Sequence, residues 1–194
     1  MTPRVARAVV MARVLRRSDG MPSTVAPPTA SPAPPVLSFD ALFRACAQEV
    51  HAYVRSLVHD PASAEDVVAL AFERAYRRRG RFDPRRGTQR AWLFAIARNA
   101  ALDELRRRRR SAALLADPED PQAAAPADLG EDADRRATVR AALAALDPRD
   151  RELVALKFWG GLSNTEIAAV LGVSESNAGT RVHRAVTKLR EACA

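Results

Sequence analysis

Residue types on which several common kinds of protein depend are scarce in this chain of 194 residues. Its two cysteines, Cys46 and Cys193, lie far apart in the sequence, so we expect neither a disulfide framework nor a cysteine metal cluster. Its three histidines, His51, His59 and His183, show no metal-ligand spacing, and the chain has no nucleophile motif. No apolar run approaches the length of a membrane span. We therefore expect no metal, no cofactor and no membrane insertion.

Acidic residues are also scarce in one part of the chain, where basic charge gathers instead. Residues 74–110 hold fourteen arginines and three acidic residues, whereas residues 111–134 hold seven acidic residues and no basic one. Residues 1–73 carry seven of each sign, and residues 135–194 carry ten basic against six acidic side chains. The formal net charge is +8. A chain with this charge distribution is expected to bind an anionic partner through its basic segments.

Strand-like alternation is nearly absent, and apolar residues recur at helical spacing in two separate stretches. Residues 38–110 and 135–194 are each predicted to form a small helical domain. Residues 111–134, rich in Ala, Pro and Asp, are predicted to be a flexible acidic linker. Residues 1–37 are predicted to be a disordered arm, because six of the thirteen prolines lie within residues 22–35. The predicted fold is all-α, with two small helical domains on a linker.

The beginning of the predicted arm has two interpretations. Residues 4–17 are basic with apolar residues along one helical face, which is compatible with a targeting or membrane-surface helix. The second interpretation is that this stretch is only an extension upstream of the true start, because Met11 or Met21 could each be the first residue. The sequence favours this second interpretation.

Residues 163–190 have the layout of a helix-turn-helix. Ser163 and Glu166 form a capping box that begins a first helix, and Gly172 can end it in the left-handed conformation. Ser174 can cap a second helix with its own apolar stripe. The opposite face of that helix carries groups that can reach phosphates and base edges in a major groove: Ser174, Ser176, Asn177, Thr180, Arg181, Arg184 and Lys188. A plain surface helix explains the spacing alone, but the cap, turn and basic face together favour DNA binding.

Gly179 is an unusual residue for the interior of that second helix. Glycine at such a position costs about 0.5 to 1 kcal/mol relative to alanine. Either the helix is weaker at Gly179, or its backbone approaches DNA closely there.

Four stretches, in order, resemble the sigma factors of bacterial RNA polymerase, and most of all the extracytoplasmic-function (ECF) group of the sigma-70 family. Residues 64–76, AEDVVALAFERAY, resemble the polymerase-binding helix of that family. Residues 82–88 followed by 91–99, AWLFAIARN, resemble its promoter-melting loop and −10-reading helix. Residues 146–152, LDPRDRE, resemble the opening of region 4, and residues 181–185, RVHRA, resemble its recognition helix.

The resemblance implies that the chain is an alternative sigma factor. Such a protein binds core RNA polymerase in the cytoplasm, recognises the −10 and −35 promoter elements and promotes DNA melting. The polymerase carries out the catalysis, so the chain is not expected to be an enzyme, and a cognate anti-sigma factor is expected as a further partner. The two domains then correspond to sigma region 2 and region 4.

The resemblance also assigns residues to each partner. The polymerase-binding set is Glu65, Asp66, Val68, Phe72, Glu73 and Tyr76. The set for the −10 element and melting is Arg81, Phe82, Thr88, Arg98, Asn99, Arg106, Arg107, Arg108, Arg109 and Arg110. The −35 set consists of the seven polar and basic residues of the helix-turn-helix named above.

Some of these residues also have structural explanations. Glu65 and Asp66 lie near the start of a predicted helix, where they offset its dipole. Cations at a helix end do the same, but five consecutive arginines at 106–110 exceed that need, so we expect them to contact duplex phosphates. Trp92 continues an apolar stripe with Ile96 and is expected in the core instead of acting as a base platform.

Two other functions remain as alternatives. A free-standing helix-turn-helix regulator explains residues 137–192 but leaves the helices at 64–76 and 91–99 without a task. An interaction adaptor, such as a sigma-sequestering protein, would use the basic face for acidic protein, and the helix-turn-helix argues against it.

Overall fold

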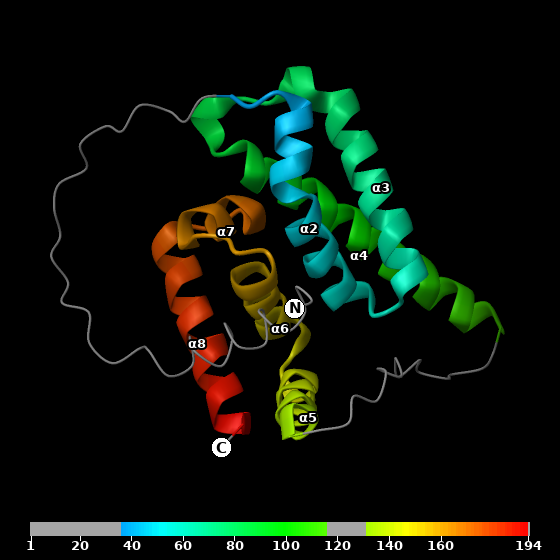
Figure 1. The fold of residues 1–194 in the computed structure, drawn as a ribbon, viewed down its shortest axis with the longest axis vertical. Coiled ribbons are helices and arrows are strands. Elements are labelled where there is room, and N and C mark those ends of the chain that lie inside the picture. The colour runs from blue at the N-terminus through cyan, green and yellow to red at the C-terminus, as the bar shows by residue number, and fades with distance from the viewer. Residues whose placement is uncertain (1–35, 116–130, 194) are drawn as a thin grey trace, which may run out of the picture.

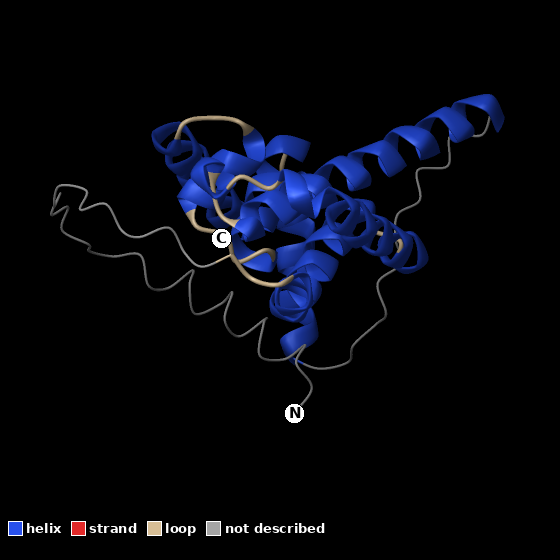
Figure 2. Ribbon diagram, turned by 90° about the horizontal axis from the view of Figure 1, so that it is seen from above, coloured by secondary structure: helices blue, strands red, loops and turns tan. Residues whose placement is uncertain are grey.

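The structure, a computed structural model, describes residues 36–115 and 131–193. Its α-helices are α2 (Phe39–Val58), α3 (Pro61–Arg78), α4 (Gln89–Leu115), α5 (Glu131–Ala145), α6 (Pro148–Val154), α7 (Asn164–Leu171) and α8 (Glu175–Cys193). Short helical turns η1 (Arg79–Arg81), η2 (Pro84–Arg86) and η3 (Ala155–Trp159) complete the secondary structure. The described residues contain no strand (Figure 2). The predicted all-α fold is confirmed.

The first domain consists of α2, α3 and α4, which pack on one another through apolar faces. Asp60 begins α3 by accepting a hydrogen bond from the Ser63 amide at 3.0 Å, with Pro61 in the first turn. Thr88 begins α4 in the same way, since its hydroxyl accepts from the Ala91 amide at 3.0 Å. Helix α4 extends beyond the other helices at its C-terminal end (Figures 1 and 2).

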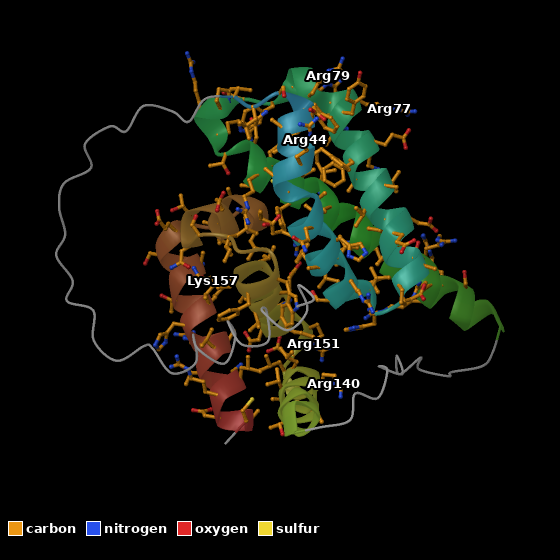
Figure 3. The ribbon with its side chains drawn as sticks, in the orientation of Figure 1. Arg44, Arg77, Arg79, Arg140, Arg151 and Lys157 are labelled. Atoms are coloured by element: carbon orange, nitrogen blue, oxygen red, sulfur yellow. The ribbon has the colours of Figure 1, made fainter. Side chains whose placement is uncertain are left out.

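The second domain contains α5 to α8, and its last two helices form the predicted helix-turn-helix. Both hydrogen bonds of the capping box are present: the Glu166 amide donates to the Ser163 hydroxyl, and the Ser163 amide donates to the Glu166 carboxylate. Gly172 ends α7 with a φ of 68°. Ser174 caps α8 through the Asn177 amide at 3.3 Å. Arg151 joins α6 to the end of α5, because its guanidinium donates to main-chain carbonyls there (Figure 3). The local signals in the sequence thus produce the expected turn.

The two domains pack against each other through one continuous apolar core, a feature that the sequence analysis did not predict. Helix α4 contacts α7, and α2 contacts η3 (Figure 1). Helix α4 continues to Leu115, and α5 begins at Glu131, so helices extend into the predicted linker from both sides. Residues 116–130 and nearly all of the predicted arm lie outside the described residues. Within the part that is described, no helix combines the length and apolar character needed to cross a membrane.

Candidate nucleic-acid interface

Helix α8 presents the predicted −35 residues on its surface. Its buried stripe, Ala178, Val182, Ala185 and Leu189, packs into the second domain. Each of the seven predicted residues on the opposite face is exposed. Within residues 36–115 and 131–193, neither Arg181 nor Arg184 forms an ion pair, so both guanidinium groups are available to an anionic ligand. The face has the composition and the helical setting of a major-groove reader.

Lys188 differs from the other residues of this face. Its ammonium group forms an ion pair with Asp150 and lies 3.7 Å from a carboxylate oxygen of Asp147. The hydrogen bond and charge of Asp150 raise the pKa of Lys188. In this conformation Lys188 therefore ties α8 to the start of α6.

Gly179 lies on the side of α8 that faces α7. A Cβ atom at this position would lie 3.4 Å from Nδ2 of Asn164, which is close to ordinary van der Waals contact. Of the two interpretations of Gly179, close approach of the backbone to DNA has no support here, because the missing side chain would point toward Asn164.

An aromatic pair marks the start of α4. The ring centroids of Phe82 and Trp92 are 5.7 Å apart with an interplanar angle of 56°. Trp92 packs against the core as expected, yet it is only half-buried, and Phe82 lies over it from the preceding loop. The pair therefore presents aromatic surface beside the exposed Arg81, which suits stacking with an unpaired base.

Two other predicted −10 residues bond to the second domain. The Thr88 hydroxyl donates to Oε1 of Glu166 at 2.9 Å. Arg98 binds Glu152 in a bidentate manner, with Nε to Oε1 at 2.7 Å and Nη2 to Oε2 at 3.0 Å. The hydrogen bond to Glu152 raises the pKa of Arg98. Asn99, the next residue, is exposed.

The arginine run at 106–110 divides into two parts. Arg106 and Arg107 pair with acidic residues of the previous helical turn, Asp103 at 3.1 Å and Glu104 at 2.8 Å. Arg108 is half-buried and holds Asp60 at 2.8 Å. Arg109 and Arg110 are exposed, and within the described part of the chain they form no ion pair. These last two are thus the arginines of the run that are free to meet phosphate.

The predicted polymerase-binding helix α3 exposes its acidic residues. Glu65 and Asp66 are exposed, while Glu73 pairs with Arg77 at 2.7 Å (Figure 3). A groove between α3 and α4 is lined by nine residues: Asp66, Val67, Leu70, Arg74, Ala100, Asp103, Glu104, Arg107 and Arg110. Leu70 is 37% exposed and was missed by the sequence analysis. Its spacing of four residues from Asp66 is the signal that places both on one face.

The apolar members of the predicted polymerase set lie in three different environments. Phe72 is buried and contacts the ring of Phe43 at 4.8 Å between centroids, so it supports the surface from below. Val68 is half-buried. Tyr76 is 50% exposed, and the Arg79 guanidinium lies 4.0 Å from its ring centroid. Only Tyr76 among these three offers a large apolar surface to a partner.

A basic cluster between α3 and α4 went largely unpredicted. The exposed arginines of this cluster, which spans the end of α3, η1 and η2, are Arg77, Arg78, Arg79, Arg81, Arg85 and Arg86. Of this cluster only Arg81 was predicted from the sequence, although the density of arginine in residues 77–86 was a signal for the whole group.

Comparison with known proteins identifies the family. The Sigma-70 region 2 family matches residues 42–111, and the Sigma-70, region 4 family matches residues 136–189. The chain is 39% identical over 157 residues to RNA polymerase sigma factor CarQ of Myxococcus xanthus, covering 79% of this chain and 88% of that protein. It is 33% identical over 152 residues to ECF RNA polymerase sigma factor SigL of Mycobacterium tuberculosis, with coverages of 77% and 85%.

Solved structures agree with this assignment. The sigma factor RpoE in complex with the anti-sigma factor NepR from Bartonella quintana matches with a TM-score of 0.63 and 27% identity, over 79% of this chain and 95% of that chain. CnrH in complex with the cytosolic domain of CnrY matches with a TM-score of 0.56 and 32% identity, over 79% and 85%. The chain belongs to the ECF sigma factors of the sigma-70 family. It is a transcription initiation factor, and a free-standing regulator is not favoured.

Proposed function

We propose that this sigma factor holds promoter DNA at two points, the −35 element and the −10 element, and that a third surface of the chain binds core RNA polymerase. Each contact is made by the residues named below. The observation that carries the proposal is the exposed face of α8, where Arg181 and Arg184 stand free on a helix-turn-helix. The chain contributes no catalytic group in this role, since RNA synthesis belongs to the polymerase, and it acts in the cytoplasm.

The −35 contact is assigned to α8. With its N-terminal half in the major groove, Ser176, Asn177 and Thr180 face base edges. Arg181 and Arg184 follow one turn later and reach phosphate or guanine. Lys188 joins them only if its bond to Asp150 is exchanged for one to DNA.

The −10 contact is assigned to the start of α4 and the loop before it. Extruding a base from the duplex costs a few kcal/mol of unstacking, which a stacking surface offsets. Phe82, supported by Trp92, provides such a surface, and Arg81 lies beside it for the phosphate. At the far end of α4, Arg109 and Arg110 contact the upstream duplex.

The polymerase contact is assigned to the groove between α3 and α4. Asp66 provides charge and Leu70 provides exposed apolar area within one patch, the combination expected at a protein interface. A cognate anti-sigma factor is a further proposed partner, because the related RpoE and CnrH were solved in complexes with NepR and CnrY.

Run-off transcription with purified core polymerase on a genomic promoter library tests the function. We expect initiation that depends on both core enzyme and this chain. The paired substitution Arg181→Ala and Arg184→Ala should abolish selection of the −35 element, whereas Arg140→Ala, an exposed arginine on α5 of the same domain (Figure 3), should not. Folded protein that initiates on no template with core enzyme, or that binds operators equally well without it, would overturn the proposal.

A further inference from the structure

Helix α8 begins with an acidic residue, and that residue is held in place from the neighbouring helix. Glu175 is the first residue of α8 and follows the Ser174 cap directly. The hydroxyl of Thr165, the second residue of α7, donates to Oε1 of Glu175 at 2.8 Å. Both residues are exposed, and α7 and α8 lie side by side (Figure 1). The carboxylate therefore has a fixed place on the surface, at the start of both helices.

No cation neutralises this carboxylate within the described part of the chain, where Glu175 forms no ion pair. On a helix, a basic partner for an acidic side chain lies three or four residues away. The positions three and four residues after Glu175 hold the buried Ala178 and Gly179, neither of which carries a charge. Glu175 thus brings an uncompensated negative charge to a face that otherwise offers Arg181 and Arg184.

The side chain of Glu175 projects beyond the end of α8. The Cα–Cβ bonds of a helix tilt toward its N-terminus, so the side chain of the first residue extends past the helix end. The recognition helix of a helix-turn-helix contacts base edges through its N-terminal residues. In the proposed −35 contact, Glu175 therefore comes to the major groove together with Ser176 and Asn177. Its charge favours base edges over phosphates, which repel it.

An ionised carboxylate can only accept hydrogen bonds, and this property selects among the bases. In the major groove, guanine presents two acceptors, and thymine presents an acceptor and a methyl group. Adenine presents a donor beside the acceptor N7, whereas cytosine presents only its N4 amino donor. Cytosine is thus the base whose edge offers a donor with no acceptor beside it. Thr165 uses one of about four acceptor sites of the Glu175 carboxylate, which leaves the others for a base.

We propose that Glu175 is a specificity residue of the −35 contact and that it selects a cytosine through the N4 amino group. Thr165 is its positioning residue, because the hydroxyl fixes the carboxylate at the end of α8. This role rests on the proposed −35 contact and adds an acidic residue to it. An unpaired carboxylate also penalises wrong sequences, since it meets acceptors there without compensation. Arg181 and Arg184 supply affinity, and Glu175 supplies selection.

Glu175 also has a structural explanation that an experiment must separate from base reading. An acidic side chain in the first turn offsets the helix dipole, and the bond to Thr165 joins α7 to α8. A purely structural role predicts that substitutions lower stability and weaken binding to all DNA sequences alike. A reading role predicts a change of preference at one base position. The profile of base preferences therefore distinguishes the two.

Selection from a randomised −35 region measures this profile. Run-off transcription on the genomic library supplies a promoter, its −35 region is randomised, and the duplexes bound by the full chain with core polymerase are sequenced. The wild-type chain should prefer cytosine at one position by about 5- to 10-fold. Glu175→Gln should move that preference to adenine, because a glutamine amide pairs with N6 and N7 of adenine. Glu175→Ala should accept every base there about equally.

Three further variants test the positioning and provide the control. Thr165→Val removes the hydroxyl and keeps the carboxylate, so it should weaken the preference for cytosine at that position. Thr165→Ser keeps a hydroxyl and should retain the preference. Glu191→Gln is the same change as Glu175→Gln at an exposed position near the end of α8, and it should leave the profile unchanged. Thermal unfolding checks that each variant is folded.

The outcomes separate this role from the proposed function. A folded Glu175→Gln protein with the wild-type profile, or with all its preferences weakened alike, would overturn the role of Glu175 and leave the −35 contact standing. A wild-type profile without a preferred cytosine would overturn it as well. A wild-type chain that shows no base preference in the randomised region, or that initiates on no template, contradicts the proposed function, and the role of Glu175 falls with it.

Discussion

Arg108 near the end of α4 holds Asp60 at the start of α3, with 2.8 Å between Nη2 and Oδ2. The same guanidinium contacts Ser63 in the first turn of α3 and, through Nε, Glu104 at 3.0 Å. One residue of the arginine run therefore fixes the crossing of two helices that border the proposed polymerase groove. This role is structural, and it separates Arg108 from Arg109 and Arg110, which follow it.

The carboxylate of Asp60 should make stability depend on pH in the acid range. Hydrogen bonds from the Ser63 hydroxyl and amide, together with Arg108, lower the pKa of Asp60 to about 2. The folded-state pKa of Asp60 lies below the unfolded value of about 3.9. The contribution of its carboxylate to the free energy of unfolding is therefore present above about pH 4 and is lost as the pH falls through about 2. Asp60→Asn keeps the helix cap and removes the charge. Urea unfolding should show a less stable variant near neutral pH and stabilities that converge as the pH falls from about 4 through about 2. A difference that stays constant over that range would contradict this cause.

The arginine run should contribute unequally to DNA binding. Replacing both Arg109 and Arg110 by alanine should reduce the slope of log affinity against log salt by roughly 2, because each lost phosphate contact removes about one counterion. The matched pair Arg106→Ala and Arg107→Ala should reduce it less, since these side chains already pair with Asp103 and Glu104. The salt dependence of both double variants is measured by fluorescence anisotropy on promoter duplex. Equal effects would contradict the prediction that Arg109 and Arg110 contribute more to phosphate binding than Arg106 and Arg107.

Gly179→Ala should stabilise the second domain. The added methyl group meets Asn164 at 3.4 Å, and alanine is favoured over glycine in a helix by about 0.5 to 1 kcal/mol. Gly172→Ala is the control, and it should destabilise the same domain, because a φ of 68° is unfavourable for any residue with a Cβ atom. Chemical unfolding of both variants measures the difference. A loss of −35 affinity in folded Gly179→Ala would instead mean that its backbone does approach DNA.

Phe82 should matter for melting more than for duplex binding. Removal of a stacking ring costs about 1 to 3 kcal/mol per base. Phe82→Ala should therefore lower the yield of open complex with core polymerase, measured by permanganate reactivity of unpaired thymines, while closed-complex affinity changes little. Phe82→Tyr keeps the ring and should retain melting. A tyrosine variant as defective as the alanine variant would argue against stacking.

Much of the second domain was predictable because its signals are local. A capping box joins residues three apart, and a glycine ends a helix through its own conformation, so Ser163, Glu166 and Gly172 indicate the helix-turn-helix directly. The exposed face of α8 follows from helical periodicity in the same way. Phe72 was harder to place, because its side chain contacts Phe43 on a different helix and lies under the surface that it was predicted to form.

By itself, the sequence determined where α7 and α8 begin, which face of α8 is polar and where positive charge accumulates, because capping, periodicity and composition act over a few residues. Only the tertiary structure decided which of the charged groups are free. Arg98 and Glu152 are 54 residues apart, and Arg108 and Asp60 are 48 apart. No periodic pattern relates such positions. They meet because helices from distant parts of the chain bury their apolar faces together, and that packing leaves Arg181 and Arg109 exposed while it pairs Arg98 and Arg108 with carboxylates.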